Sequence, residues 1–164
     1  MAVTTTASLS SIWQSIRDTY SQFSYKRAKT ARWSPDETTV YFLPIRSSED
    51  YAYNLHELGH ALCGHSGFTQ DIDLLSLERE AWDRAAVVAG HYDTPIVPSL
   101  IEASLDSYRE WMHTRSRCPH CRSAGIQQKV SLDYSCPLCG TRWHTNDARQ
   151  CELRRFVIQK PRSL

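Results

Sequence analysis

Residues Tyr53 to Leu62 read Tyr-Asn-Leu-His-Glu-Leu-Gly-His-Ala-Leu, which contains the pattern His-Glu-x-x-His. On a helix, His56 and His60 lie one turn apart on the same face, so both imidazoles can bind one Zn²⁺. Glu57 follows the first histidine and can accept a proton from a zinc-bound water, whose pKa the metal lowers to about 7. Gly59 permits close packing beside the metal. The pattern therefore predicts a buried helix that carries a catalytic zinc site.

The composition is that of an ordinary globular protein. The chain has 164 residues, with 41% hydrophobic and 23% charged residues, enough for one compact domain and a small second one. Residues 1–11 are rich in Thr and Ser and lack the basic and apolar regions of a signal peptide. No apolar run approaches about 18 residues. We therefore expect a cytoplasmic protein without a membrane partner, in which residues 1–7 are disordered.

The charge is distributed unevenly along the chain. Residues 1–114 contain 9 Lys and Arg against 15 Asp and Glu, whereas residues 115–164 contain 10 against 3. The first part of the chain is therefore acidic and the second part basic. We predict two domains with a boundary between residues 114 and 115.

Periodicity and capping residues predict four helices in residues 1–114. They comprise a helix from Ser8 that ends in the basic residues from Lys26, a helix from Ser47 or Ser48 to Cys63, and helices at 74–90 and 100–113. A turn is expected at 33–37, a strand at 38–43, and a loop from Gly64 to Asp73. By position alone, that strand corresponds to the one that holds the substrate backbone in zinc peptidases. The fold class expected is α+β.

A catalytic zinc site needs a third protein ligand and one position open for water. Two glutamates after the His-Glu-x-x-His pattern, Glu78 and Glu80, can provide this ligand, and His65 or another histidine is a further alternative. His65 follows His60 by five residues and would lie off the ligand face if the helix continued. Cys63 shares the ligand face, but a buried thiol in the core is the simpler role for it.

Two segments of the chain resemble a known family. His-Glu-Leu-Gly-His-Ala-Leu at 56–62, followed by Glu-Arg-Glu-Ala at 78–81, resembles the ImmA/IrrE-type zinc peptidases. The lead-in at 48–55 is similar to the peptidase domain of ArdC-type antirestriction proteins. The resemblance covers residues 38–90 and implies a zincin-like fold of the gluzincin type. It implies Glu78 as the third ligand, with Glu80 as the alternative.

Other residues could support the reaction. Asp71 or Asp73 could orient a zinc-bound imidazole, or could cap a helix. Hydrolysis also needs a hydrogen-bond donor for the oxyanion. The sequence does not choose among the candidates, which are Tyr53, His91, Tyr92, Tyr108 and His113.

Four of the six cysteines form two Cys-x-x-Cys pairs. These are Cys118 with Cys121 and Cys136 with Cys139, separated by fourteen residues. The spacing predicts a structural Zn²⁺ held by four thiolates in a zinc ribbon, with strands at 127–134 and 141–144. Because about fifty residues bury little core, zinc should supply much of the folding energy. Four thiolates leave no open coordination position, so no catalysis is expected there.

The ribbon is strongly basic, and the aromatic residues Tyr134, Trp143 and Phe156 lie among its Arg and Lys residues. This combination favours contact with single-stranded or double-stranded DNA. Docking on the acidic first domain is the alternative. Proteases of the SprT type also join His-Glu-x-x-His to a C-terminal zinc ribbon and act on DNA-bound proteins. Their third ligand is a histidine farther along the chain, for which this sequence has no clean match.

The sequence thus predicts two Zn²⁺ per chain, one catalytic and one structural. The expected function is that of a zinc metalloendopeptidase whose substrate is one specific protein, a regulator or a nucleic-acid-associated protein, with the ribbon recruiting DNA or the partner. Glu57 would act as the catalytic base. Two alternatives remain open: a non-proteolytic DNA-binding or counter-defence protein of a mobile element, and a structural two-zinc adaptor.

Overall fold

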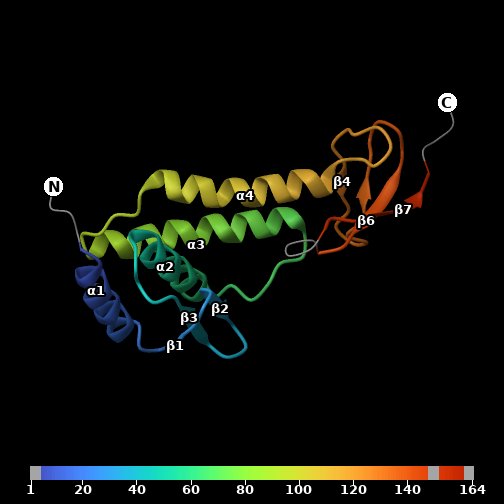
Figure 1. The fold of residues 1–164 in the computed structure, drawn as a ribbon. Coiled ribbons are helices and arrows are strands. Elements are labelled where there is room, and N and C mark those ends of the chain that lie inside the picture. Colours follow the sequence, from blue (N-terminus) through green and yellow to red (C-terminus); the bar gives the residue numbers. More distant parts are fainter. Residues whose placement is uncertain (1–4, 148–151, 161–164) are drawn as a thin grey trace. The chain divides into compact units, whose positions relative to one another are not determined.

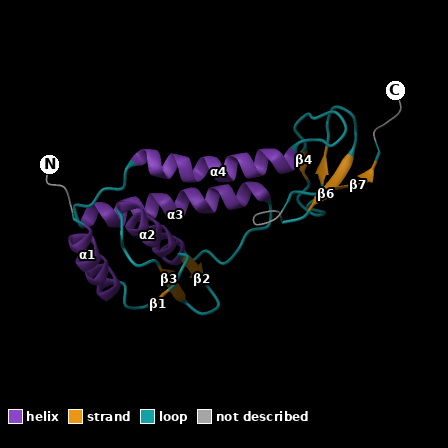
Figure 2. Ribbon diagram, viewed as in Figure 1, coloured by secondary structure: helices purple, strands orange, loops and turns teal. Residues whose placement is uncertain are grey.

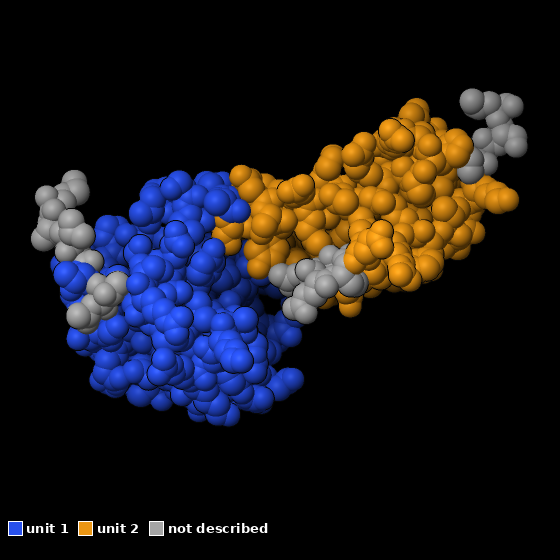
Figure 3. All heavy atoms as spheres, viewed as in Figure 1, with its two compact units in different colours: residues 1–67, 76–103 blue, residues 68–75, 104–164 orange. Residues whose placement is uncertain are grey.

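The structure is a computed structural model that describes residues 5–147 and 152–160. This part of the chain contains four helices and seven strands in two sheets, which makes the fold a mixed α and β one (Figures 1 and 2). Two compact units are present (Figure 3). The first comprises residues up to 67 with 76–103, and the second comprises 68–75 with 104–164. None of the helices in the described ranges is long and apolar enough to cross a membrane.

Helix α1 (Thr6–Thr19) begins earlier than predicted. The Thr5 side chain caps it by accepting a hydrogen bond from the Ser8 N–H at 3.3 Å. Leu9, Trp13 and Ile16 are buried at the spacing of one helix face. Residues 5–7, which we expected to be disordered, thus form the cap and first turn of this helix, whereas residues 1–4 lie outside the described residues.

The sheet of the first unit has the order β1-β3-β2. Its strands are β1 (Ser24–Arg27), β2 (Arg32–Ser34) and β3 (Thr39–Phe42). Strand β3 was predicted, but β1 and β2 lie where we expected the end of a helix and a turn. β1 pairs with β3 in parallel and β2 pairs with it antiparallel. Because β3 is paired on both sides, its backbone has no edge to offer a substrate, and the positional analogy for β3 is wrong.

Helix α2 (Ser48–Cys63) carries the His-Glu-x-x-His pattern and has the predicted ends. Ser47 and Asp50 form a reciprocal capping box, in which the Asp50 N–H donates to the Ser47 hydroxyl at 3.1 Å. Gly64 ends the helix with a φ of +71°, a left-handed conformation that glycine adopts without strain. Leu55 and Leu58 are fully buried and anchor the helix in the core.

Helix α3 (Asp71–His91) packs closely against α2 at Gly59. A Cβ atom built on Gly59 would lie 2.2 Å from the carbonyl oxygen of Ala81. Only glycine allows the two backbones to approach this closely. This contact places the helix that carries Glu78 beside the helix that carries the histidine pair. Helix α4 (Pro98–Ser116) follows.

The second unit contains an antiparallel sheet of order β4-β5-β6-β7. The strands are β4 (Ile126–Gln127), β5 (Tyr134–Ser135), β6 (Arg142–Thr145) and β7 (Arg155–Gln159). Tyr134 and Trp143 stack in its core with ring centroids 5.5 Å apart. The strand expected at 127–134 is instead two short strands joined by a turn, in which Leu132 has a φ of +59°. Strand β7 was not predicted.

Asp71 connects the start of α3 to the ribbon, within the second unit. Its buried carboxylate accepts hydrogen bonds from Arg115 Nε at 2.5 Å and from the Tyr134 hydroxyl. The Gln127 side chain accepts a hydrogen bond from the Asp71 N–H at 2.8 Å. Residues 68–75 and 104–114 therefore belong with the ribbon, which differs from the boundary expected after residue 114. Asp73 caps the helix by accepting from the Gln70 N–H at 2.8 Å.

Candidate metal centres

Three predicted ligands converge in the first unit. His56 Nε2 lies 3.0 Å from Glu78 Oε2 and 3.1 Å from His60 Nε2, and His60 Nε2 lies 3.5 Å from Glu78 Oε2. Helix α2 supplies the two imidazoles and α3 supplies the carboxylate; Figure 1 labels both helices. His56 and Glu78 are buried. This group of residues could hold a metal ion.

The spacing of these three atoms fits a small tetrahedral ion. Ligand atoms about 2.0–2.1 Å from a tetrahedral Zn²⁺ lie about 3.3 Å from one another. The three distances observed range from 3.0 to 3.5 Å. An ion bound by these ligands would have one coordination position left, because structural tetrahedral sites use four protein ligands and this group has three.

The site keeps its carboxylate ionised. Burial opposes ionisation of Glu78, but hydrogen bonds from His56 and His60 outweigh it and lower the pKa of Glu78 to about 2. The His56 ring stacks on the fully buried ring of Trp82, with centroids 4.3 Å apart. The buried Nδ1 of His56 has no hydrogen-bond partner among the described residues. This imidazole is therefore positioned by its Nε2 contact with Glu78 and by packing against Trp82, with no hydrogen bond at Nδ1 from the described part of the chain.

Glu57 contacts the edge strand of the sheet. Its Oε2 accepts a hydrogen bond from the backbone N–H of Trp33 at 2.7 Å. The indole N–H of the same Trp33 donates to the carbonyl oxygen of His65 at 2.8 Å. Trp33 thus links the predicted base to the loop after α2. Sequence reasoning missed this residue, since Glu57 and Trp33 are 24 positions apart and no local pattern joins them.

The two alternative ligands lie behind His60 rather than among the converging atoms. His65 Nδ1 is 2.8 Å from His60 Nδ1, and His65 Nε2 is 3.3 Å from Glu80 Oε2. Burial lowers the pKa of His65, and the hydrogen bond with Glu80 opposes this effect. Cys63 donates a weak hydrogen bond to the Glu80 carbonyl at 3.9 Å and is half-buried. Cys63 is not among the residues that converge.

The candidate oxyanion donors are dispersed. Tyr53 packs edge-on against Trp82 with centroids 6.0 Å apart, on the helix that carries the histidines. The Tyr92 hydroxyl is bonded to Thr19 on α1 at 2.8 Å. His91 is exposed at the end of α3. Tyr108 and His113 belong to the second unit. Tyr53 thus contacts Trp82, the residue on which the predicted ligand His56 stacks.

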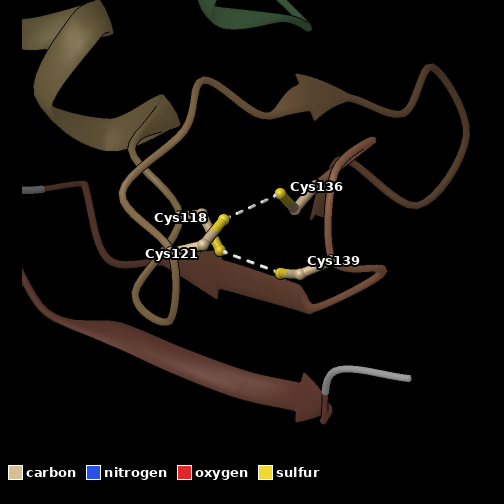
Figure 4. Close-up of side chains that lie close together, drawn as sticks. All are labelled: Cys118, Cys121, Cys136 and Cys139. Carbon is tan, nitrogen blue, oxygen red and sulfur yellow. Dashed lines mark hydrogen bonds between the residues drawn. The ribbon is translucent and has the colours of Figure 1, made fainter. Parts of the chain in front are cut away.

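The four predicted cysteines converge in the second unit (Figure 4). The Sγ atoms of Cys118 and Cys139 are 3.7 Å apart, and those of Cys121 and Cys136 are 3.4 Å apart. All four are free thiols, because a disulfide would need about 2.05 Å. Sulfur atoms around a tetrahedral Zn²⁺ lie about 3.8 Å apart. The cluster could therefore hold a second metal ion.

The two Cys-x-x-Cys segments form matching turns. The N–H of Arg122 donates to the Cys118 carbonyl, and the N–H of Gly140 donates to the Cys136 carbonyl, both at 3.0 Å. Each donor has a positive φ, +64° at Arg122 and +75° at Gly140. Each turn thereby points its two thiols toward the same centre (Figure 4). Such paired turns suit a closed metal site with four sulfur ligands.

Hydrogen bonds bias two of these thiols, those of Cys121 and Cys139, toward the thiolate form that binds metals. The Ser123 backbone N–H and then its hydroxyl lower the pKa of Cys121 to about 6. The Thr141 hydroxyl lowers the pKa of Cys139. Burial has the opposite effect at Cys136 and raises its pKa to about 11. The remaining cysteine, Cys151, lies outside the described residues.

Comparison of the chain with models of protein families, with curated proteins and with solved structures returned no match.

Proposed function

We propose that this chain is a zinc-dependent endopeptidase with a catalytic and a structural zinc. The observation that supports it is the convergence of His56, His60 and Glu78, with Glu57 on the same helix as the histidines. Two imidazoles and one carboxylate are the ligand set of zinc hydrolases that keep an open position. The four thiols of the ribbon are the ligand set of a structural zinc.

The chain's own residues would carry the proton transfers. Zinc, when bound, polarises the scissile carbonyl and lowers the pKa of the attacking water. Glu57 accepts a proton from this water and passes it to the leaving amine. The Trp33 N–H holds one oxygen of the Glu57 carboxylate at 2.7 Å. The second oxygen is the one that takes up the proton.

The edge strand β2 is the natural place for an extended substrate. In the order β1-β3-β2, no strand in the described residues pairs with the outer edge of β2. Trp33 belongs to β2, and its N–H is directed to Glu57. An extended peptide can add to such an edge through backbone hydrogen bonds, which gives affinity without a deep pocket. The scissile bond would then run beside Glu57.

The ribbon presents a surface suited to nucleic acid. His144 and Phe156 are exposed on neighbouring strands and stack with centroids 4.9 Å apart. Arg142 lies two residues before His144, on the same face of β6, because side chains alternate along a strand. Stacked aromatic rings beside a cation suit the bases and phosphates of a single strand. We propose that the ribbon brings the peptidase to a protein bound to DNA.

Metal content and substrate trapping test the proposal together. We expect two zincs per chain in the wild type and in Glu57→Gln, and one in His56→Ala with the fold retained. Glu57→Gln, tagged and cross-linked in cells, should retain a protein that the wild type cleaves, with new N-termini found by mass spectrometry. Cleavage of that protein by Glu57→Gln would contradict the mechanism. One zinc in both the wild type and His56→Ala would contradict the catalytic site.

A non-proteolytic DNA-binding protein is the second candidate, and the stacked His144 and Phe156 favour it. Its sign would be DNA binding and an intact cellular phenotype in Glu57→Gln, without new N-termini in the wild type.

A further inference from the structure

His65 is a buried histidine that the converging ligands do not include. Its exposed fraction is 8%, and it follows the glycine that ends α2. Its backbone is held twice: its N–H donates to the His60 carbonyl at 3.1 Å, and its carbonyl accepts from the Trp33 indole at 2.8 Å. These contacts fix the main chain, and the contacts of the two ring nitrogens with His60 and Glu80 define the direction of the side chain. That direction is toward the rear of the His60 ring.

With a metal ion bound by His60 Nε2, the positions of the ring nitrogens allow one consistent set of protons. His60 directs Nε2 toward His56 and Glu78, so a metal ion there would use the lone pair of Nε2. A neutral imidazole then carries its proton on Nδ1. His60 Nδ1 is 2.8 Å from His65 Nδ1, which must therefore accept. The proton of His65 then lies on Nε2, 3.3 Å from Glu80 Oε2.

From this geometry we infer that His65 is a positioning residue for the metal ligand His60, with Glu80 as the final acceptor of the chain of hydrogen bonds. A hydrogen bond from the far nitrogen of an imidazole fixes its tautomer and rotation and makes the ligating nitrogen more basic. The inference rests on the metal site of the proposed function, but it does not require hydrolysis. Its readout is metal affinity.

The two histidine ligands are therefore held by different means. His56 lies against the ring of Trp82, and its Nδ1 has no hydrogen-bond partner among the described residues. His60 instead has a polar partner behind it that ends in a carboxylate. Substitutions behind His60 should change how tightly the metal is held. The corresponding change behind His56 would act through packing alone.

Two substitutions of His65 separate hydrogen bonding from packing. In Phe the ring remains but both nitrogens are lost, whereas in Asn an oxygen remains that can accept from His60 Nδ1. The Kd for zinc is measured on the full chain by competition with a chelator. Because two zinc ions are expected, the signal that is absent in His56→Ala is assigned to the site of His56, His60 and Glu78. We expect His65→Phe to raise the Kd about 10- to 100-fold. His65→Asn should stay close to the wild type.

A second experiment substitutes Glu80, and substitution of the exposed residue Asp83 is its control. Glu80→Gln should weaken zinc binding less than His65→Phe does, because the Glu80 side chain is 62% exposed. The matched control Asp83→Asn removes another exposed acid from α3 and should leave the Kd unchanged. In the His65→Asn background, Glu80→Gln should have no further effect, since the link between the two residues is already broken.

The outcomes are distinct. If His65→Phe binds zinc with the Kd of the wild type, the proposed chain of hydrogen bonds from His60 through His65 to Glu80 is wrong, but the proposed metal site is unaffected. If His65→Asn binds zinc more weakly than His65→Phe, His65 acts through packing. If both variants lose zinc binding completely and equally, His65 is itself a ligand. Each of these results overturns the proposed chain of hydrogen bonds. A wild-type protein that binds no zinc at the site of His56, His60 and Glu78 refutes the proposed function, and the proposed chain of hydrogen bonds fails with it.

Discussion

The backbone N–H of Trp33 donates to the carboxylate of Glu57 over 2.7 Å, which joins the edge strand β2 to the helix of the histidine pair. Through its indole, the same residue also holds the carbonyl of His65 at 2.8 Å. One residue of the sheet thus contacts both the predicted base and the loop behind the predicted ligand His60. Hydrogen bonds through Trp33 and His65 therefore connect the predicted base Glu57, the edge strand β2 and the predicted ligand His60.

Replacement of Glu57 by Gln should separate chemistry from metal binding. The amide oxygen of Gln can still accept from the Trp33 N–H, so the fold and both zincs should be retained. Loss of the base should lower the cleavage rate about 10²- to 10⁴-fold. Zinc per chain and the rate of substrate cleavage measure the two effects. Equal rates for the variant and the wild type would remove Glu57 from the mechanism.

Replacement of Gly59 by Ala should damage the first unit. The new Cβ would lie 2.2 Å from the Ala81 carbonyl oxygen, so α2 and α3 must move apart. Forced overpacking of this kind costs about 1–3 kcal/mol or more, and the separation also moves Glu78 away from the histidines. The midpoint of thermal unfolding, Tm, and the zinc content per chain should both be lower than in the wild type. Gly90→Ala is the matched control, because nothing lies within 4 Å of its Cβ position; equal stability of the two variants would contradict the close approach.

Helix α2 could be predicted from sequence because its signals are local. Ser47 with Asp50 marks the start, Gly64 marks the end, and the apolar residues between them follow the helical period. Strand β3 has four residues and was recognised by its β-branched and aromatic run, whereas β1 (Ser-Tyr-Lys-Arg) and β2 (Arg-Trp-Ser) contain no β-branched residue. Pairing with β3 creates them. The central position of β3, and hence the edge at β2, follows from tertiary pairing that the sequence does not display.

The residues of the metal centres likewise divide into those that a local sequence pattern predicts and those that depend on the tertiary structure. His56, His60 and the four cysteines follow from spacing alone, but Glu78 depended on a family resemblance, because Glu80 lies only two positions away. His65 was an alternative third ligand, disfavoured because it would lie off the ligand face if the helix continued. Gly64 ends the helix and turns the chain back, so that His65 reaches the rear of His60. The glycine was the available signal for this placement.

Loss of Asp71 should destabilise the second unit. Asp71→Ala leaves the buried Arg115 without its carboxylate partner and removes the acceptor of the Tyr134 hydroxyl. Breaking a buried ion pair in this way costs about 3–5 kcal/mol. Chemical unfolding measures the loss. The double variant Asp71→Ala with Arg115→Met should recover part of it, because no buried charge is then unpaired; a double variant as unstable as the single one would argue against this explanation.

Removal of one thiol ligand should unfold the ribbon. Cys118 and Cys136 make up half of the four-residue buried cluster, with Tyr134 and Trp143. Cys136→Ser should lower the zinc content by one per chain and expose Trp143, because metal binding supplies folding energy in so small a core. Metal analysis, Trp fluorescence and limited proteolysis measure these effects. Cys63→Ser is the control and should change none of them, since Cys63 lies outside the cluster.

Substitution of the exposed aromatic pair should weaken binding of single-stranded DNA. Phe156 stacks on His144, and base–aromatic stacking contributes about 1–3 kcal/mol per base, so Phe156→Ala should raise the Kd about 5- to 150-fold. Arg142→Gln should instead lower the slope of log K against log salt by about 0.7, because it removes one phosphate contact. Fluorescence anisotropy with a labelled oligonucleotide measures both. Val130, which is 97% exposed in the same unit, provides the control Val130→Ala. If Val130→Ala weakens binding as much as Phe156→Ala, or if the wild type binds no oligonucleotide at low salt, the stacked pair is not a nucleic-acid site. The ribbon's partner would then be sought among proteins.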